Sequence, residues 1–229
     1  IHQGGNGTLL SGVPGVQPGK VLVLGGGVVG SSAIRVALGM GAEVTVLDRS
    51  ITRLGQLDEQ YAGRLRTIYS TAAAIDECAQ ESDLIIGAVL IPGASAPKLI
   101  SRSQLTQFKP GTVMVDVAID QGGCFETSKP TTHAQPTYQV ANVVHYCVAN
   151  MPGAVAKTAT MALTNATLPY IMQLAQGDVA SALQADAHFG AGLNVYDGKL
   201  THAAVATALG EPCVPAVEAL NAHMQLKTA

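Results

Sequence analysis

The stretch KVLVLGGGVVG, residues 20–30, decides the fold of this chain. An apolar strand leads into a glycine-rich turn, and the turn opens a helix near Val28. Gly25, Gly27 and Gly30 have the spacing Gly-x-Gly-x-x-Gly: the first permits a tight turn, the second lets a ligand approach the backbone, and the third lets the helix lie close to the strand. The unpaired N–H groups at the start of such a helix favour a bound pyrophosphate.

A second strand, residues 43–48, ends on Asp48, at the distance of about 20 residues at which dinucleotide-binding folds place an acid for the ribose hydroxyls. The glycine triplet alone would also fit a structural turn beside a surface aspartate. The strand before it, the helix after it and the acid at the next strand tip together favour a dinucleotide site. Asp48 predicts NAD rather than NADP, although an arginine at position 49 could accommodate a 2′-phosphate.

Composition limits the function classes. The chain has 229 residues, of which 48% are hydrophobic and 13% charged, so we expect other protein to cover much of its surface. A net charge of −3 without any cluster of Lys and Arg argues against nucleic acid or an anionic membrane as partner. No membrane helix or signal peptide is recognisable, so we expect a cytoplasmic protein. Metal-ligand spacing is absent from the cysteines, and we expect reduced thiols and no metal site at Cys78, Cys124, Cys147 and Cys213.

Strand and helix patterns alternate from Lys20 to about Met151. We expect strands at residues 20–24, 43–48, 64–70, 83–90, 112–118 and 143–148, and helices at residues 28–40, 51–61, 71–79 and 98–108. This alternation predicts an α/β fold with a doubly wound parallel sheet of the Rossmann type. Functional residues of such a sheet lie at the carboxyl ends of its strands, which selects Asp48, Ser70, Leu90, Asp120 and Asn150.

The pattern changes after this region. We expect a dinucleotide-binding domain over residues 1–152, with a linker at 1–18, and a second domain's C-terminal part over 153–229. That part begins with a long helix, residues 154–174, which Pro169 should kink or interrupt, and has a possible turn at Asp197-Gly198. The helix could be an assembly surface or a spine between domains. The chain opens IHQGGNG without an initiator Met, and we expect it to come from the middle of a longer polypeptide.

Five segments resemble bacterial alanine dehydrogenase: GVPGV (12–16), GAVLIPG (87–93), IDQGGCFE (119–126), VANMPGAV (148–155) and ALTNATLPY (162–170). The resemblance extends over essentially the whole chain. The NAD-binding part of the proton-translocating transhydrogenase shares the general plan but is less similar in the DQGGC and ANMP segments. It is the alternative interpretation and would require a membrane partner.

The resemblance implies an NAD-dependent enzyme that interconverts L-alanine with pyruvate and ammonia, and it implies a homo-oligomer, namely a hexamer. It makes Asp120 an active-site acid, places Asn150 and Met151 near the nicotinamide, and assigns cofactor contacts to Val28, Val29, Asp48, Arg53, Ser70, Val89, Leu90, Val117 and Val148. The family's substrate-binding Arg and catalytic Lys and His lie upstream of the glycine turn, in a half that is absent here. The fragment alone should therefore bind NAD without turnover, and a pure binding module is a competing hypothesis.

Structural interpretations remain open for several of these residues. Asp120 could cap a turn, and Asn150 could simply precede one. Ser70 could be the N-cap of the next helix, and Arg53 could be a solvated residue on a helix face. His145 lies in an apolar run, and we expect it to be buried and hydrogen-bonded.

Overall fold

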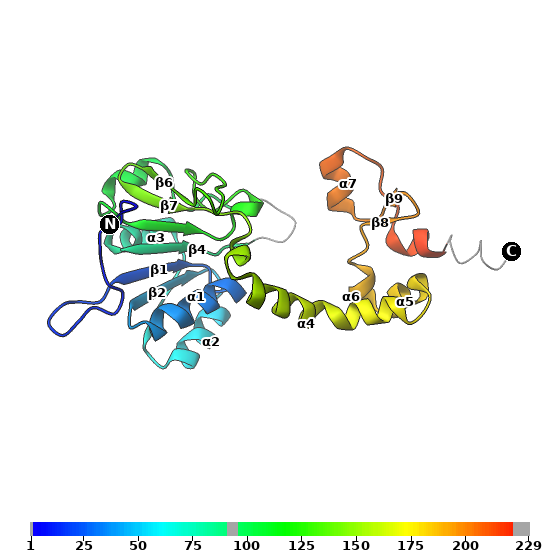
Figure 1. The fold of residues 1–229 in the computed structure, drawn as a ribbon, viewed down its shortest axis with the longest axis horizontal. Coiled ribbons are helices and arrows are strands. Elements are labelled where there is room, and N and C mark those ends of the chain that lie inside the picture. The colour runs from blue at the N-terminus through cyan, green and yellow to red at the C-terminus, as the bar shows by residue number, and fades with distance from the viewer. Residues whose placement is uncertain (1, 91–95, 222–229) are drawn as a thin grey trace. The chain divides into compact units, whose positions relative to one another are not determined.

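A computed structural model describes residues 2–90 and 96–221 of the chain, which separates into two compact units between Ala154 and Val155. The first unit contains six parallel strands, β1 (Lys20–Leu24), β2 (Glu43–Asp48), β3 (Leu65–Tyr69), β4 (Leu84–Gly87), β5 (Val113–Asp116) and β7 (Val143–Tyr146). An antiparallel strand, β6 (Thr137–Val140), lies at one edge. The order β3-β2-β1-β4-β5-β7-β6 confirms the doubly wound sheet (Figure 1).

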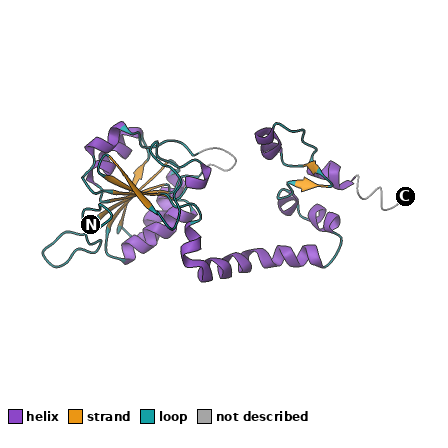
Figure 2. Ribbon diagram, turned by 45° about the horizontal axis from the view of Figure 1, so that its top comes forward, coloured by secondary structure: helices purple, strands orange, loops and turns teal. Residues whose placement is uncertain are grey.

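Helices lie against both faces of this sheet (Figure 2). Successive strand residues point to opposite faces, so Val21 and Val23 belong to one apolar core and Leu22 and Leu24 to another. The valines pack with α1 (Val28–Gly39) and α2 (Ile51–Tyr61), and the leucines pack with α3 (Ala72–Glu81). Burial on both faces explains why β1 reads as a continuous apolar run.

The structure corrects four expected elements. The helix expected at 98–108 is wrong, since only a 3₁₀ turn, η1 (Ser103–Gln107), forms there. Extended backbone precedes it because Leu99 N donates to Cys124 O (2.7 Å) and the Ser101 N–H is taken by the Gln104 side chain (2.7 Å). Three expected strands are too long, since β4 ends at Gly87, β5 at Asp116 and β7 at Tyr146. The edge strand β6 was not predicted at all.

The second unit begins with α4 (Ala156–Ala175), after a 3₁₀ turn, η3 (Met151–Val155). The expected interruption at Pro169 is wrong, since α4 runs through it. Short helices follow, α5 (Val179–Ala185), α6 (Ala187–Gly190) and α7 (Ala203–Leu209). The predicted turn is confirmed: Asp197 and Gly198 have φ of 48° and 72° and join β8 (Val195–Tyr196) to β9 (Lys199–Leu200). Among the described residues, no helix combines the length and apolarity needed to cross a bilayer.

His145 confirms the expected buried histidine. It is fully buried in β7, its Nδ1 donates to Val143 O (3.1 Å), and its Nε2 lies 2.7 Å from Thr127 Oγ1. Because the Nδ1 proton faces a carbonyl, Nε2 accepts from the Thr127 hydroxyl, as in the neutral ring. Burial lowers the pKa of His145 below its ordinary value of 6.5.

This lowered pKa predicts a loss of stability in acid. The unfolded chain binds a proton at His145 at higher pH than the folded chain, so the free energy of unfolding falls as pH drops below about 6.5. His145→Asn should flatten this dependence between about pH 7 and pH 5 in urea titrations. His2→Asn removes an exposed histidine and provides the control for the substitution itself. An unaltered slope in His145→Asn contradicts the interpretation.

Candidate dinucleotide site

The glycine turn between β1 and α1 is built by two different constraints. Gly25 has φ of 99°, a left-handed conformation that favours glycine. A Cβ added at Gly30 would lie 1.8 Å from the carbonyl oxygen of Gly25, so only glycine lets α1 begin this close to β1. A Cβ at Gly27 would meet nothing within 4 Å. The open space at Gly27 is what a pyrophosphate close to the backbone requires.

Asp48 and Arg53 connect this turn to the next strand and helix. The Gly26 N–H donates to Asp48 Oδ2 (2.7 Å), and Arg53 Nε donates to Gly26 O (2.7 Å). Arg53 also donates to Ser31 Oγ (2.6 Å) in α1. Asp48 Oδ1 accepts one bond, from Ser50 N (2.8 Å), so each carboxylate oxygen keeps capacity for a ribose hydroxyl. The solvated interpretation of Arg53 is wrong, because its guanidinium fixes the turn.

The carboxyl ends of the central strands lie at the same edge of the sheet as this turn. Backbone hydrogen bonds continue past the strand ends, from Ser70 N to Asp48 O (2.9 Å), from Ala88 N to Leu24 O (2.8 Å) and from Val117 N to Gly87 O (3.0 Å). The strand order reverses between β1 and β4, which is where doubly wound sheets bind their ligands. Large apolar side chains stay exposed next to this edge, with Val28 88% and Leu90 55% exposed.

Asp120 lies after β5, in the 3₁₀ turn η2 (Ile119–Gln121). Its side chain is exposed, and its carboxylate has no hydrogen bond to any residue that the structure describes. The capping alternative is wrong, because the N–H groups of Gly122 and Gly123, which such a cap would take, donate to Ile119 O and Ala118 O (both 3.0 Å). Asp116 was not predicted from the sequence, where its signal is a charged residue inside an otherwise apolar strand.

The remaining predicted contacts differ in exposure. Asn150 is exposed with φ of 58°, and its carbonyl accepts a bond from His133 Nε2 (3.0 Å). Ser70 is not an N-cap, since Thr71 Oγ1 accepts from Ala74 N and starts α3 itself. Val148 is fully buried and offers a ligand no side-chain surface. Val29, Val89 and Met151 are at least partly exposed; residues 91–93 of the GAVLIPG segment lie outside the described residues.

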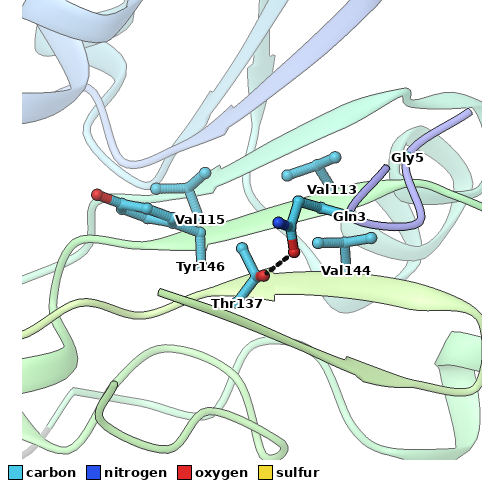
Figure 3. A pocket seen from close by; sticks show the side chains of 7 residues that line it. All are labelled: Gln3, Gly5, Val113, Val115, Thr137, Val144 and Tyr146. Carbon is cyan, nitrogen blue, oxygen red and sulfur yellow. Dashed lines mark hydrogen bonds between the residues drawn. The ribbon is translucent and has the colours of Figure 1, made fainter. Parts of the chain in front are cut away.

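Two other features do not resemble a cofactor site. An apolar hollow lies over β5, β6 and β7 (Figure 3), lined by Gln3, Gly5, Val113, Val115, Thr137, Val144 and Tyr146. Its polar side chains bind each other, since Thr137 Oγ1 donates to Gln3 Oε1 (3.0 Å), and it has no charged group for a phosphate. Within residues 2–90 and 96–221, no three His, Cys, Asp or Glu side chains are grouped as a metal site would need.

Fold and strand-edge geometry together define a Rossmann-type domain with the features of a dinucleotide site. Residues 1–203 match the family model described as alanine dehydrogenase/PNT, C-terminal domain, and the chain belongs to this family.

Named relatives agree with this assignment. An alanine dehydrogenase from Halomonas elongata is 66% identical over 219 residues, which are 96% of this chain and 59% of the relative. An alanine dehydrogenase from Bacillus subtilis is 52% identical over 220 residues, which are 96% of this chain and 58% of the relative. A solved L-alanine dehydrogenase superimposes with a TM-score of 0.87 at 51% identity, over 91% of this chain and 58% of the other. A transhydrogenase from Sinorhizobium meliloti superimposes with a TM-score of 0.67 at 27% identity, over 82% of this chain and 51% of the other. The chain thus spans little more than half of the relatives' length.

The glycine geometry predicts opposite outcomes for two alanine substitutions. Gly30→Ala forces backbone apart at Gly25 and should lower the free energy of unfolding by about 1–3 kcal/mol or more. Gly27→Ala enters open space and should cost less than about 1 kcal/mol, the size of a weakened helix N-cap. Urea unfolding of both variants measures the difference. Equal losses would show that α1 does not depend on its close approach to β1.

Proposed function

We propose that this chain binds NAD and forms the cofactor-binding part of an alanine dehydrogenase that interconverts L-alanine with pyruvate and ammonia. The observation that carries the proposal is the glycine turn with Asp48 on one side and the unpaired Asp120 carboxylate along the same sheet edge. The identity to enzymes named alanine dehydrogenase supplies the substrate class.

Different residues of the chain are proposed to bind different parts of the cofactor. The N–H groups at the start of α1 remain unpaired within the helix and face the space beside Gly27, which suits a pyrophosphate. Asp48 accepts from the adenosine ribose, and the exposed Val28 and Leu90 provide apolar contact. When bound, the nicotinamide supplies the hydride chemistry.

Asp120 is the residue that we assign to the reaction itself. Its free carboxylate can hold a proton or stabilise a neighbouring cation as substrate and product interconvert. The resemblance pairs it with a His, and gives a Lys and an Arg to the substrate, all outside this chain. Asn150 and Met151, at the exit of β7, complete the proposed nicotinamide side. The other assigned cofactor contacts are Gly25, Gly30, Arg53, Ser70, Val29, Val89 and Val117, with the buried Val148 contributing through its backbone alone.

Two competing functions are distinguishable. The transhydrogenase alternative has less support, given 27% identity to the solved transhydrogenase against 51% to the solved L-alanine dehydrogenase. A binding module without turnover differs from the proposal in one assay, NADH absorbance after alanine and NAD are added to the complete polypeptide. For the 229-residue chain alone we propose NAD binding without turnover.

We further propose that the complete enzyme is a cytoplasmic homo-oligomer. Its resemblance to alanine dehydrogenase suggests a hexamer. Helix α4 supports the oligomer, since none of its described side chains is buried and Met161, Leu163 and Ile171 are exposed. Apolar surface of this kind is seldom left to water. A spine between domains would use the same surface within one subunit. Light scattering of the complete protein measures the subunit number.

Cofactor choice follows from Asp48. NAD should bind more tightly than NADP, because a 2′-phosphate would meet the Asp48 carboxylate whereas a 2′-hydroxyl donates to it. Asp48→Ala should narrow the ratio of the two dissociation constants in calorimetry. Arg49→Ala is the neighbouring control and should leave NAD preferred. Comparable constants in the unchanged chain would contradict the assignment of Asp48.

Asp120→Asn tests the catalytic role. In the complete enzyme, this substitution should lower kcat by about 10²–10⁴-fold, the range for a lost general acid–base group. The dissociation constant for NAD should change by no more than about threefold, because the amide keeps the size of the side chain and Asp48 holds the adenosine end. Steady-state kinetics and calorimetry give the two values. A normal kcat would remove Asp120 from the reaction.

A further inference from the structure

We propose that Asp116 is a positioning residue that fixes the loop of residues 118–125 and thereby sets where the Asp120 carboxylate lies. The consequence for catalysis rests on the proposed function. The anchoring of the loop does not, because it follows from contacts within the chain.

Asp116 is the last residue of β5 and is fully buried. Its Oδ1 accepts from Ala118 N (3.1 Å), and its Oδ2 accepts from Cys124 N (2.7 Å), Phe125 N (3.3 Å) and the Ser128 hydroxyl. All four partners donate, and an ionised carboxylate is the side chain that only accepts. Such charge-assisted bonds are about twice as strong as neutral ones.

The loop's glycines permit this close wrapping. Gly123 has φ of 75°, and a Cβ there would lie 2.6 Å from Asp116 Oδ2. A Cβ at Gly87, which pairs with Asp116 in the sheet, would lie 2.8 Å from the Phe125 ring. The segment therefore folds around the carboxylate only because glycine occupies both positions.

A second contact holds the loop from its outer side. Lys98 Nζ donates to the carbonyl oxygens of Gly122 and Gly123, the latter at 2.9 Å. The backbone on both sides of Asp120 is thus fixed, while the Asp120 side chain stays exposed. A displacement of about 1 Å in a catalytic group can cost about 100-fold in rate, so the precision of this anchor has a kinetic consequence.

Asp116→Asn tests the anchor with little change in volume. One amide oxygen replaces two carboxylate oxygens, and the NH₂ group is brought against N–H donors. Hydrogen exchange of the amides of residues 118–125 should become faster in this variant. The measurement needs neither cofactor nor substrate, so it tests the anchor even if the wild-type chain fails to bind NAD and the proposed function is wrong.

Asp83→Asn is the matched control. Asp83 also accepts three bonds, from Lys20 N (2.8 Å), Lys109 Nζ (3.1 Å) and Asn6 Nδ2 (3.1 Å), but it immediately precedes β4, at the opposite end of the strands. It should lose stability without faster exchange in residues 118–125. Equal exchange in these residues for the two variants overturns the proposal, because the effect would then be general loosening.

Kinetics of the complete enzyme separate positioning from a merely structural role. Asp116→Asn should lower kcat by about 10- to 100-fold while KM and the dissociation constant for NAD stay within about threefold, and Asp83→Asn should leave kcat unchanged. If Asp116→Asn does not fold, Ser128→Ala removes one donor and keeps the three N–H groups, and should give the same pattern with a smaller fall. An unchanged kcat in the folded variant overturns the proposal.

Discussion

The first unit depends on how closely α1 approaches the end of β1. The Gly30 position lies so near the Gly25 carbonyl that a single methyl group would overlap it. This contact fixes the direction of α1, and α1 in turn supplies Ile34 and Ala37 to the core on one face of the sheet. The N–H groups that begin α1 are therefore aimed by packing, before any ligand binds. Site geometry and core packing are one constraint in this region.

Structure and site also depend on the same side chain at the end of β2. Asp48 orders the turn through Gly26 N, and its carboxylate oxygens keep lone pairs free for the proposed ribose contact. Arg53 donates to the Gly26 carbonyl and to Ser31, so the N–H and the C=O of Gly26 are both held by side chains. These hydrogen bonds within the chain orient the turn, and a site that is ordered by its own protein contacts binds a ligand at a lower entropic cost.

The sequence predicted those parts that local periodicity and steric rules determine. Apolar strands buried on both faces, the spacing of the three glycines and the Asp197-Gly198 turn each have a local physical signature. Strand β6, TYQV, has no such signature, because it is a partly exposed edge strand that depends on its pairing with β7. The expected helix at 98–108 failed because bonds to Cys124 and Glu126, distant in sequence, hold its first residues extended.

Asp116 and Asp120 show where sequence reasoning stops. They lie four residues apart, and both follow or end an apolar strand, so a pattern of residue types treats them as similar. The structure separates them by burial: Asp116 has four hydrogen-bond donors inside the protein, whereas Asp120 is exposed. A buried carboxylate whose lone pairs are occupied is unsuited to exchanging protons with a substrate, and an exposed one with no partner is suited to it. The loop needs both residues, because the position of the exposed Asp120 carboxylate depends on how firmly the buried Asp116 holds the loop backbone.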